Sequence, residues 1–215
     1  MISSGDNNFN VFLGNGFERK IISLIYGPPA SGKTTLCLQT ALNIAKTGRV
    51  LFIDSENGFS INRLKQMDPN YTEYLENIIV VKVKDFDEQI KVFENIEGIV
   101  KNGNFDIIIV DTIGMQYRKA LQESNNYVHI NEKVLSGLRK LKHLAEDNNI
   151  PILITNQIYT NMKGENIGVG GRMMSGFGKC LIELKNNPRR ALMQKPIEKI
   201  FYFEIDNSGI KELLR

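Results

Sequence analysis

The sequence predicts an α/β protein in which helices flank a mainly parallel, twisted sheet and an antiparallel β-meander follows at the C-terminal end. Three observations predict this class. Short apolar runs alternate with longer amphipathic runs over residues 21–155, a glycine-rich turn joins the first two runs, and residues 180–214 hold short apolar runs separated by turn residues alone. Strands alternating with helices form a parallel sheet, whereas strands joined by turns pair antiparallel.

Each element has its own signal. The expected strands are the apolar, mostly β-branched runs at residues 21–26, 50–54, 78–83, 107–111 and 151–155. The expected helices carry apolar residues at three- and four-residue spacing and cover residues 34–45, 60–67, 86–100 and 128–146. In the tail, the expected strands are residues 180–184, 199–205 and 210–214. Turn sequences such as Asn186-Asn187-Pro188 separate them and leave no room for a helix.

Two stretches lack a packing pattern. Residues 114–131 are polar, and residues 158–178 hold six glycines. Each follows the end of an expected strand, and long irregular segments in a compact domain usually carry function. Both are therefore expected to be functional loops, although the first could partly extend the helix after it and either could be a plain surface loop.

Length and composition limit the number of domains and the classes of partner that we expect. The 215 residues suffice for one α/β domain, and we expect a single core domain over residues 1–215. A formal net charge of +3 neither demands nor excludes nucleic acid. The two cysteines, Cys37 and Cys180, indicate buried, reduced thiols in a cytoplasmic protein. No signal sequence and no membrane-spanning run are found, so no membrane partner is expected.

The glycine-rich turn has the pattern G-x-x-x-x-G-K-[ST] between a strand and a helix. Its residues are Gly27, Pro28, Pro29, Ala30, Ser31, Gly32, Lys33 and Thr34, with Thr35 next in the helix. In this context the pattern predicts a phosphate-binding loop, because glycines let backbone N–H groups turn toward phosphate oxygens and the helix adds its positive end. Lys33 is expected to reach the β- and γ-phosphates, and the Thr34 hydroxyl to coordinate Mg²⁺. The alternative is a chance match in an ordinary strand–helix turn.

A carboxylate supports the same site. Asp111 ends the apolar run 107–111, and ligands bind at the carboxyl ends of parallel strands. Asp111 is therefore expected to hold Mg²⁺ through water. Asp106 starts the same run and lies at its opposite end, where it is expected to cap or contact solvent.

Four further segments resemble the RecA/RadA recombinase family. They are residues 13–18, residues 52–56, residues 154–157 and the run from Gly170 to Leu184, and together with the phosphate loop they span nearly the whole chain. The resemblance implies a RecA-like P-loop NTPase core that binds ATP and Mg²⁺. It also implies that Glu56 polarises the attacking water, that Gln157 senses the γ-phosphate, and that Lys33 acts with them in catalysis.

Arg63 matches an arginine that packs on adenine in this family, as a planar guanidinium can. From the residues alone, Arg63 could equally be a solvated helix arginine, and Glu56 could be a helix cap.

The two irregular stretches match the family's DNA-binding loops. The resemblance implies single-stranded DNA held mainly through its phosphates. The candidate contacts are Arg118, Lys163, Arg172, Lys179 and a cluster around the tail hairpin formed by Lys185, Arg189 and Arg190. The hairpin cluster could instead be a solvated turn.

Two departures from the family pattern narrow the expected function. About 20 residues precede the first strand, too few for the family's N-terminal helical DNA-binding domain, and residues 191–196 lack the aspartate that caps a neighbouring subunit's nucleotide. These absences favour a short archaeal paralogue over the recombinase itself. We expect an accessory protein of homologous recombination and DNA repair, with weak Mg-dependent ATPase activity and no efficient strand exchange. Its expected partners are DNA, a RadA-type recombinase and other repair proteins, with possible homo-oligomers. The alternative is a KaiC-like regulatory ATPase of the same fold that acts through protein partners.

Overall fold

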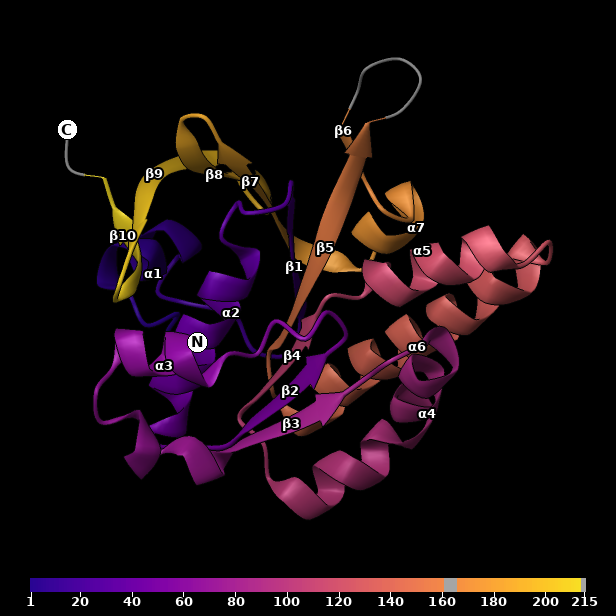
Figure 1. Cartoon of the computed structure of the whole chain (residues 1–215), viewed down its shortest axis with the longest axis horizontal. Helices are drawn as coiled ribbons and strands as arrows, with labels where there is room; N and C mark the ends of the chain where they lie inside the picture. Colours follow the sequence, from indigo (N-terminus) through magenta and orange to yellow (C-terminus); the bar gives the residue numbers. More distant parts are fainter. Residues whose placement is uncertain (161–165, 214–215) are drawn as a thin grey trace.

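The fold is organised by one long sheet with its parallel strands in the middle. The computed structural model describes residues 1–160 and 166–213. Within those residues the strand order is β10-β9-β8-β7-β1-β5-β4-β2-β3, with β6 paired to the end of β5 (Figure 1). The strands are β1 (Ile22–Gly27), β2 (Val50–Asp54), β3 (Ile78–Lys82), β4 (Ile107–Asp111), β5 (Ile152–Thr160), β6 (Asn166–Gly168), β7 (Gly178–Asn186), β8 (Arg189–Lys195), β9 (Lys199–Asp206) and β10 (Gly209–Glu212). The strands from β7 to β3 in this order are parallel, and β8, β9 and β10 continue the sheet antiparallel.

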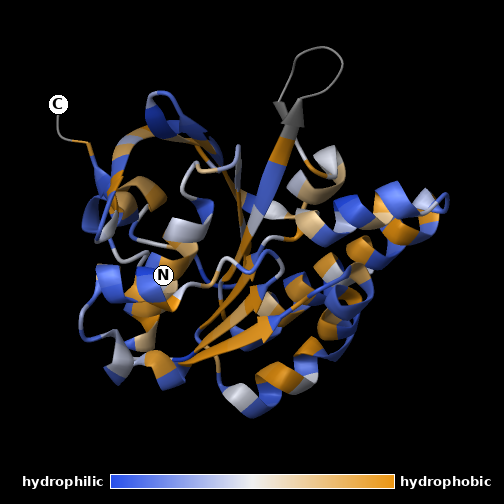
Figure 2. Cartoon of the chain, viewed as in Figure 1, coloured by the Kyte–Doolittle hydropathy of each residue, from blue (hydrophilic) through white to orange (hydrophobic). Residues whose placement is uncertain are grey.

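Helices lie on both faces of the sheet. They are α1 (Asn7–Leu13), α2 (Lys33–Ala45), α3 (Ile61–Met67), α4 (Phe86–Gly103), α5 (Gly114–Glu123), α6 (Tyr127–Asn148) and α7 (Gly171–Ser175), with short 3₁₀ turns at Tyr71–Glu73 and Leu75–Asn77. One core layer joins α1, α2 and α3 to the sheet, and the other joins α4, α5, α6 and α7 to the opposite face. Figure 2 shows the apolar central strands enclosed between helices that are polar on their outer sides.

Alternation along each central strand explains the two layers. In β4, Ile107 and Ile109 enter the layer with α2, whereas Ile108 and Val110 enter the layer with α4 and α6. All four side chains are fully buried. A strand whose successive side chains point to opposite covered faces must be apolar throughout, which is why β4 reads as an unbroken apolar run.

Side-chain caps fix where several helices begin and end. Four helices, α1, α3, α4 and α6, have a side chain just before their first residue that accepts a hydrogen bond from a backbone N–H of the first turn. These capping residues are Asp6, Ser60, Asp85 and Asn126. Asn104 and Asn149 end α4 and α6 in the left-handed conformation that asparagine tolerates. Local sequence therefore sets the lengths of these helices, and the sheet sets their positions.

The predicted fold class is confirmed, including the antiparallel strands at the C-terminal end. Each expected parallel strand and helix is present within a few residues of its predicted bounds. Cys37 and Cys180 are buried and free, as predicted. In the described part of the chain, no helix has both the length and the apolar character needed to cross a membrane.

The prediction of a loop at residues 114–131 is wrong, because most of this stretch is helical. Helix α5 covers Gly114–Glu123, and Tyr127 already starts α6. Its polar residues are compatible with burial because they have backbone and side-chain partners: Gln116 donates to the Ser55 carbonyl at 2.9 Å, and Tyr117 donates to Asn131 Oδ1 at 2.7 Å. A buried polar group that has a hydrogen-bond partner destabilises the fold little. The polar composition of residues 114–131 does not show which of its side chains have such partners.

The second expected loop, residues 158–178, is also partly regular. Strand β5 continues to Thr160, β6 returns beside it, and α7 covers Gly171–Ser175. Residues 161–165 lie outside the described part. Strand β8 was missed because its ends are polar and only Ala191 and Met193 are buried, which leaves too short an alternation to recognise.

Helix α1 was missed in the polar N-terminal stretch. Its Phe9 and Phe12 pack on Phe201 of β9, with ring centroids 5.4 and 5.5 Å away. Aromatic contacts across nearly the whole chain length stabilise this helix, and they have no local signal in the sequence.

Candidate functional site

The glycine-rich loop connects β1 to α2 at the carboxyl edge of the parallel strands. Gly27 is the last residue of β1 and Lys33 the first of α2. Gly32 has φ 104°, in the left-handed region, and a Cβ there would lie 2.9 Å from Ile205 of β9. The backbone conformation favours glycine at this position, and a larger residue would also have to displace the end of the Ile205 side chain.

Lys33 is buried inside the loop. Its ammonium group donates to the Gly27 carbonyl at 2.9 Å and to the Pro28 carbonyl at 2.8 Å. Burial lowers the pKa of Lys33, and the carboxylates of Asp111 and Glu56 act against that shift. The Ser31 hydroxyl oxygen is also buried and has no hydrogen-bond partner among the described residues. A cation and an unpartnered hydroxyl thus face the interior of the loop's turn.

Asp111 ends β4 next to the loop and is 1% exposed. Its Oδ1 accepts a hydrogen bond from the Thr155 hydroxyl, while its Oδ2 is buried without a partner among the described residues. Burial raises the pKa of Asp111, and the hydrogen bond from Thr155 together with the nearby Thr34 hydroxyl opposes this rise. A buried carboxylate oxygen without a partner, beside the Thr34 hydroxyl, fits a small, hard divalent cation, which prefers oxygen ligands.

Asp54 builds the turn that carries Glu56. Its carboxylate accepts backbone N–H groups from Glu56, Gly58 and Phe59, at 3.2, 3.0 and 3.1 Å. Three backbone donors to one carboxylate fix the chain immediately after β2. Sequence reasoning identified Asp54 only as the end of a strand. The signal for this role is the short polar segment that follows it.

Glu56 accepts two side-chain hydrogen bonds at one oxygen. Its Oε1 accepts from the Thr112 hydroxyl at 2.9 Å and from the Gln157 amide at 2.8 Å. Glu56 follows β2, Thr112 follows β4, and Gln157 lies in β5, directly opposite Gly27 of β1 in the sheet register. The structure therefore brings together Glu56 and Gln157, which sequence reasoning had assigned separately.

Thr112 was missed by sequence reasoning. Its backbone is fixed by Ser55, whose hydroxyl donates to the Thr112 carbonyl at 2.6 Å and accepts from the Thr112 N–H at 3.0 Å. These bonds aim the Thr112 hydroxyl at Glu56. The available signal was its position directly after Asp111, at the edge where the carboxyl ends of the strands meet.

The end of β5 connects this site to the glycine-rich segment. The Val169 N–H donates to the Gln157 carbonyl at 2.8 Å, and the Asn156 amide donates to the Val169 carbonyl at 2.7 Å. Asn156 is 1% exposed. A change in the position of Gln157 would therefore act directly on the backbone around residue 169.

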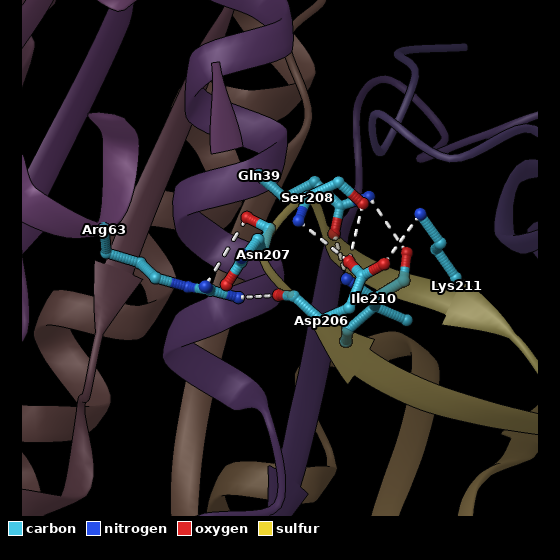
Figure 3. Close-up of polar contacts among 7 residues, drawn as sticks. All are labelled: Gln39, Arg63, Asp206, Asn207, Ser208, Ile210 and Lys211. Carbon is cyan, nitrogen blue, oxygen red and sulfur yellow. Dashed lines mark hydrogen bonds and ion pairs between the residues drawn. The ribbon is translucent and has the colours of Figure 1, made fainter. Parts of the chain in front are cut away.

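Arg63 contacts the tail hairpin. Its guanidinium donates to the Asp206 carbonyl at 2.5 Å (Figure 3). It also donates to Gln66 Oε1 at 2.9 Å. The contact joins α3 to the turn between β9 and β10. The predicted adenine contact of Arg63 stays a prediction, but its planar group is held by the fold and is not a freely solvated arginine.

The same hairpin is fastened to α2 (Figure 3). Gln39 accepts from the Ile210 N–H at 2.7 Å and donates to the Ile210 carbonyl at 3.3 Å, as a neighbouring strand would. Within the turn, Asp206 accepts from the Ser208 N–H and hydroxyl and forms an ion pair with Lys211 at 2.7 Å. The hydrogen bond from Lys211, followed by those from Ser208, lowers the pKa of Asp206 to about 2.

The predicted DNA contacts do not form one group in the described residues. Arg118 on α5 and Lys179 on β7 are exposed, whereas Lys163 and the Arg172 side chain lie outside the described part. The hairpin cluster is divided. Arg189 donates to the Ala30 carbonyl of the glycine-rich loop at 3.0 Å, while Lys185 pairs with Glu183 at 3.6 Å.

The comparisons with known proteins agree with the fold and the motifs. The Rad51 family model matches residues 1–196. A Methanocaldococcus jannaschii protein named DNA repair and recombination protein RadB is 36% identical, over 94% of this chain and 97% of that one. A Thermococcus kodakarensis protein of the same name is 31% identical, over 99% of this chain and 100% of that one. A solved structure titled "Crystal structure of the RadB recombinase" matches all of both chains with a TM-score of 0.82 and 30% identity.

The chain therefore belongs to the Rad51 family. The predicted RecA-like fold and the predicted resemblance to RadB, a short archaeal paralogue, are confirmed by these relatives.

Replacing Lys211 tests the hairpin's electrostatics. In Lys211→Gln, the pKa of Asp206 should rise from about 2 toward its ordinary value, because its main hydrogen-bond donor loses its charge. A depressed pKa contributes stability that is complete above the unfolded-state pKa, at roughly pH 4, and is lost as the pH falls through the folded value. The stability difference between wild type and variant should therefore be largest above roughly pH 4 and shrink toward pH 2.

Carboxyl NMR titration and denaturant unfolding at several pH values measure both effects. Lys65→Gln, an exposed charge removal on α3, is the matched control. An unchanged Asp206 pKa in Lys211→Gln would show that the ion pair does not set it.

Proposed function

We propose that this protein binds ATP with Mg²⁺ at the carboxyl edge of its parallel strands and uses the state of that nucleotide to control binding of single-stranded DNA. It would act as an accessory to a RadA-type recombinase in homologous recombination and repair. The observation that carries the proposal is the hydrogen bond from Gln157 to Glu56, since it joins the predicted hydrolytic carboxylate to the strand that leads into the glycine-rich segment.

The phosphate end of the site is supported by charge and backbone geometry. Residues Gly27 to Thr34 would surround the phosphates with N–H groups, and the positive end of the α2 dipole would add to the attraction. Lys33 would exchange its bonds to the Gly27 and Pro28 carbonyls for bonds to phosphate oxygens. Thr34 and Asp111 would hold Mg²⁺, which neutralises phosphate charge when bound.

The hydrolytic step would depend on Glu56. A carboxylate near the terminal phosphate can orient a water molecule and accept its proton. Thr112 and Gln157 both donate to one oxygen of Glu56, which leaves the other oxygen without these partners and holds the side chain in one rotamer.

DNA binding would follow from the position of Gln157. If Gln157 turns toward a γ-phosphate, its bond to Glu56 must change, and the Val169 N–H that depends on its carbonyl would shift with it. Arg118 on α5 is exposed and available for phosphate contacts. Lys179 is also exposed, but it lies beside Ile22 and Ser23 at the amino end of β1, at the opposite edge of the sheet from Gln157. The RadB relatives are named for DNA repair and recombination, which favours DNA over a protein partner as the ligand.

Nucleotide-dependent DNA binding is the test of this function. Fluorescence anisotropy with a single-stranded oligonucleotide, at about 50 mM salt and above, should show binding that weakens steeply with salt. Affinity should be higher with a non-hydrolysable ATP analogue than with ADP, because only the triphosphate reaches Gln157. Gln157→Ala should bind nucleotide as well as wild type and lose this difference.

Two outcomes would contradict the proposal in different ways. DNA binding indifferent to nucleotide in the wild type would remove the coupling. No DNA binding at low salt, with Mg-nucleotide bound, would favour the KaiC-like alternative and direct attention to protein partners.

Thr112 provides a separate test of the hydrolytic step. Thr112→Val removes one donor to the Glu56 carboxylate while keeping the side-chain shape. A hydrogen bond to a charged group is worth roughly 1.5–3 kcal/mol, so kcat should fall by about tenfold or more, with little change in KM, because Glu56 loses a group that orients it. Thr112→Ser keeps the hydroxyl and should restore the wild-type rate in a steady-state ATPase assay. If Thr112→Ser behaves like Thr112→Val, the hydroxyl is not the group that matters.

A further inference from the structure

The β7–β8 hairpin lies against the glycine-rich loop at three consecutive points. A Cβ on Gly27 would overlap the Leu184 carbonyl oxygen, so the loop's first residue touches the β7 backbone. The Asn186 amide donates to the Pro29 carbonyl at 3.1 Å. The Arg189 guanidinium donates to the Ala30 carbonyl at 3.0 Å. The hairpin thus contacts the loop from its first residue to its middle.

The strand register explains why these two side chains reach the loop together. Asn186 and Arg189 are opposite each other across the hairpin, and the next pair inward is Lys185 and Arg190. Successive side chains of a strand point to opposite faces, so one pair faces the loop and the other faces away. Lys185 accordingly pairs with Glu183 on its own strand, two residues away on the same face. The basic cluster of the sequence is therefore divided, with Arg189 on the face toward the loop and Lys185 and Arg190 on the other face.

The contacts fall on the part of the loop that has two prolines and a non-glycine residue in a left-handed conformation. Pro28 and Pro29 have no N–H, so phosphate binding must rely on the donors from Ala30 onward. Ala30 has φ 59°, a left-handed conformation that is unfavourable for a residue with a Cβ. The hydrogen bonds to the Pro29 carbonyl before Ala30 and to the carbonyl of Ala30 itself offset this cost.

The direction of these bonds sets the direction of the N–H groups. In a trans peptide the C=O and the N–H point in opposite directions. When Asn186 holds the Pro29 carbonyl and Arg189 holds the Ala30 carbonyl, the Ala30 and Ser31 N–H groups must point away from the hairpin. Without a ligand the Ser31 N–H donates to the Pro28 carbonyl at 3.3 Å, and a phosphate would take over this donor. Carbonyl oxygens turned inward would repel phosphate, so fixing them outward favours an anion-binding loop.

We propose that Asn186 and Arg189 are positioning residues that hold the glycine-rich loop, from within the same chain, in the conformation that binds the phosphates of a nucleoside triphosphate. Arg189 is then part of the nucleotide site's support and not a DNA contact, in contrast to its assignment from sequence. This inference rests on the proposed nucleotide binding.

The test compares two neighbouring arginines on opposite faces of one strand. Arg189→Met keeps the aliphatic stem and removes the donor, Arg189→Lys keeps a charged donor, and Arg190→Met is the matched control. Affinity for a fluorescent ADP or ATP analogue with Mg²⁺ should fall about tenfold in Arg189→Met, recover in Arg189→Lys and stay unchanged in Arg190→Met. DNA binding without nucleotide should be the same in Arg189→Met as in wild type.

A ligand-free measurement separates this inference from the proposed function. Amide hydrogen exchange at Ser31, whose N–H donates to the Pro28 carbonyl at 3.3 Å, should be faster in Arg189→Met than in wild type or Arg190→Met, with no change in the midpoint of unfolding. If wild type binds nucleotide and Arg189→Met binds it equally well, the inference is overturned and the proposed function stands. If wild type binds no nucleotide, the proposed function fails, and the exchange rates alone decide whether the hairpin holds the loop. Lost DNA affinity in Arg189→Met with unchanged nucleotide affinity and exchange would make Arg189 a DNA contact.

Discussion

The carboxyl ends of β1, β2, β4 and β5 meet at one edge of the sheet because these strands run parallel, and the candidate site depends on this constraint. Each strand brings one part to the edge. β1 ends in the glycine-rich loop, the segments after β2 and β4 carry Glu56 and Thr112, and β5 carries Gln157. Residues more than a hundred positions apart in the chain thus come within hydrogen-bond distance. An antiparallel sheet would distribute them over two edges.

Several polar groups at this edge are buried, and their partners show what the site is adapted to hold. Burying a charge costs several kcal/mol unless hydrogen bonds or an opposite charge compensate. Asp54 receives three backbone N–H groups, and Lys33 donates to two carbonyls. Asp111 has a partner at one oxygen, while its other oxygen has none among the described residues. The compensated groups build the site's shape, and the uncompensated oxygen marks where a cation fits.

The tail strands have a second role as a support for this edge. Gly32 is packed against Ile205, Gln39 and Arg63 fasten the β9–β10 turn to α2 and α3, and the β7–β8 turn touches the loop. The loop and the helix that follows it are therefore held on both sides by residues from the last part of the chain. Changes in the tail hairpins are expected to reach the proposed nucleotide site for this reason.

Sequence reasoning could predict what local patterns encode. The unbroken apolar run of β4, the spacing of apolar residues in α4, and the motif at Gly27 to Thr34 each contain their own signal. The fold class and the position of the glycine-rich loop and Asp111 at one edge of the sheet could therefore be predicted. It could not predict α5, whose polar residues are buried only because Ser55 and Asn131 supply partners. Nor could it predict that Arg189 and Arg190 lie on different faces of the hairpin, since the face of each side chain depends on the register of β7 with β8.

The most direct test of the central claim is nucleotide binding itself, measured by isothermal titration calorimetry of the full chain with ATP analogue, with and without Mg²⁺. The account predicts binding that Mg²⁺ strengthens in wild type, with a much smaller effect of Mg²⁺ in Asp111→Asn and no binding in Lys33→Ala. A correctly folded wild-type protein that shows no binding at millimolar Mg-nucleotide would contradict it.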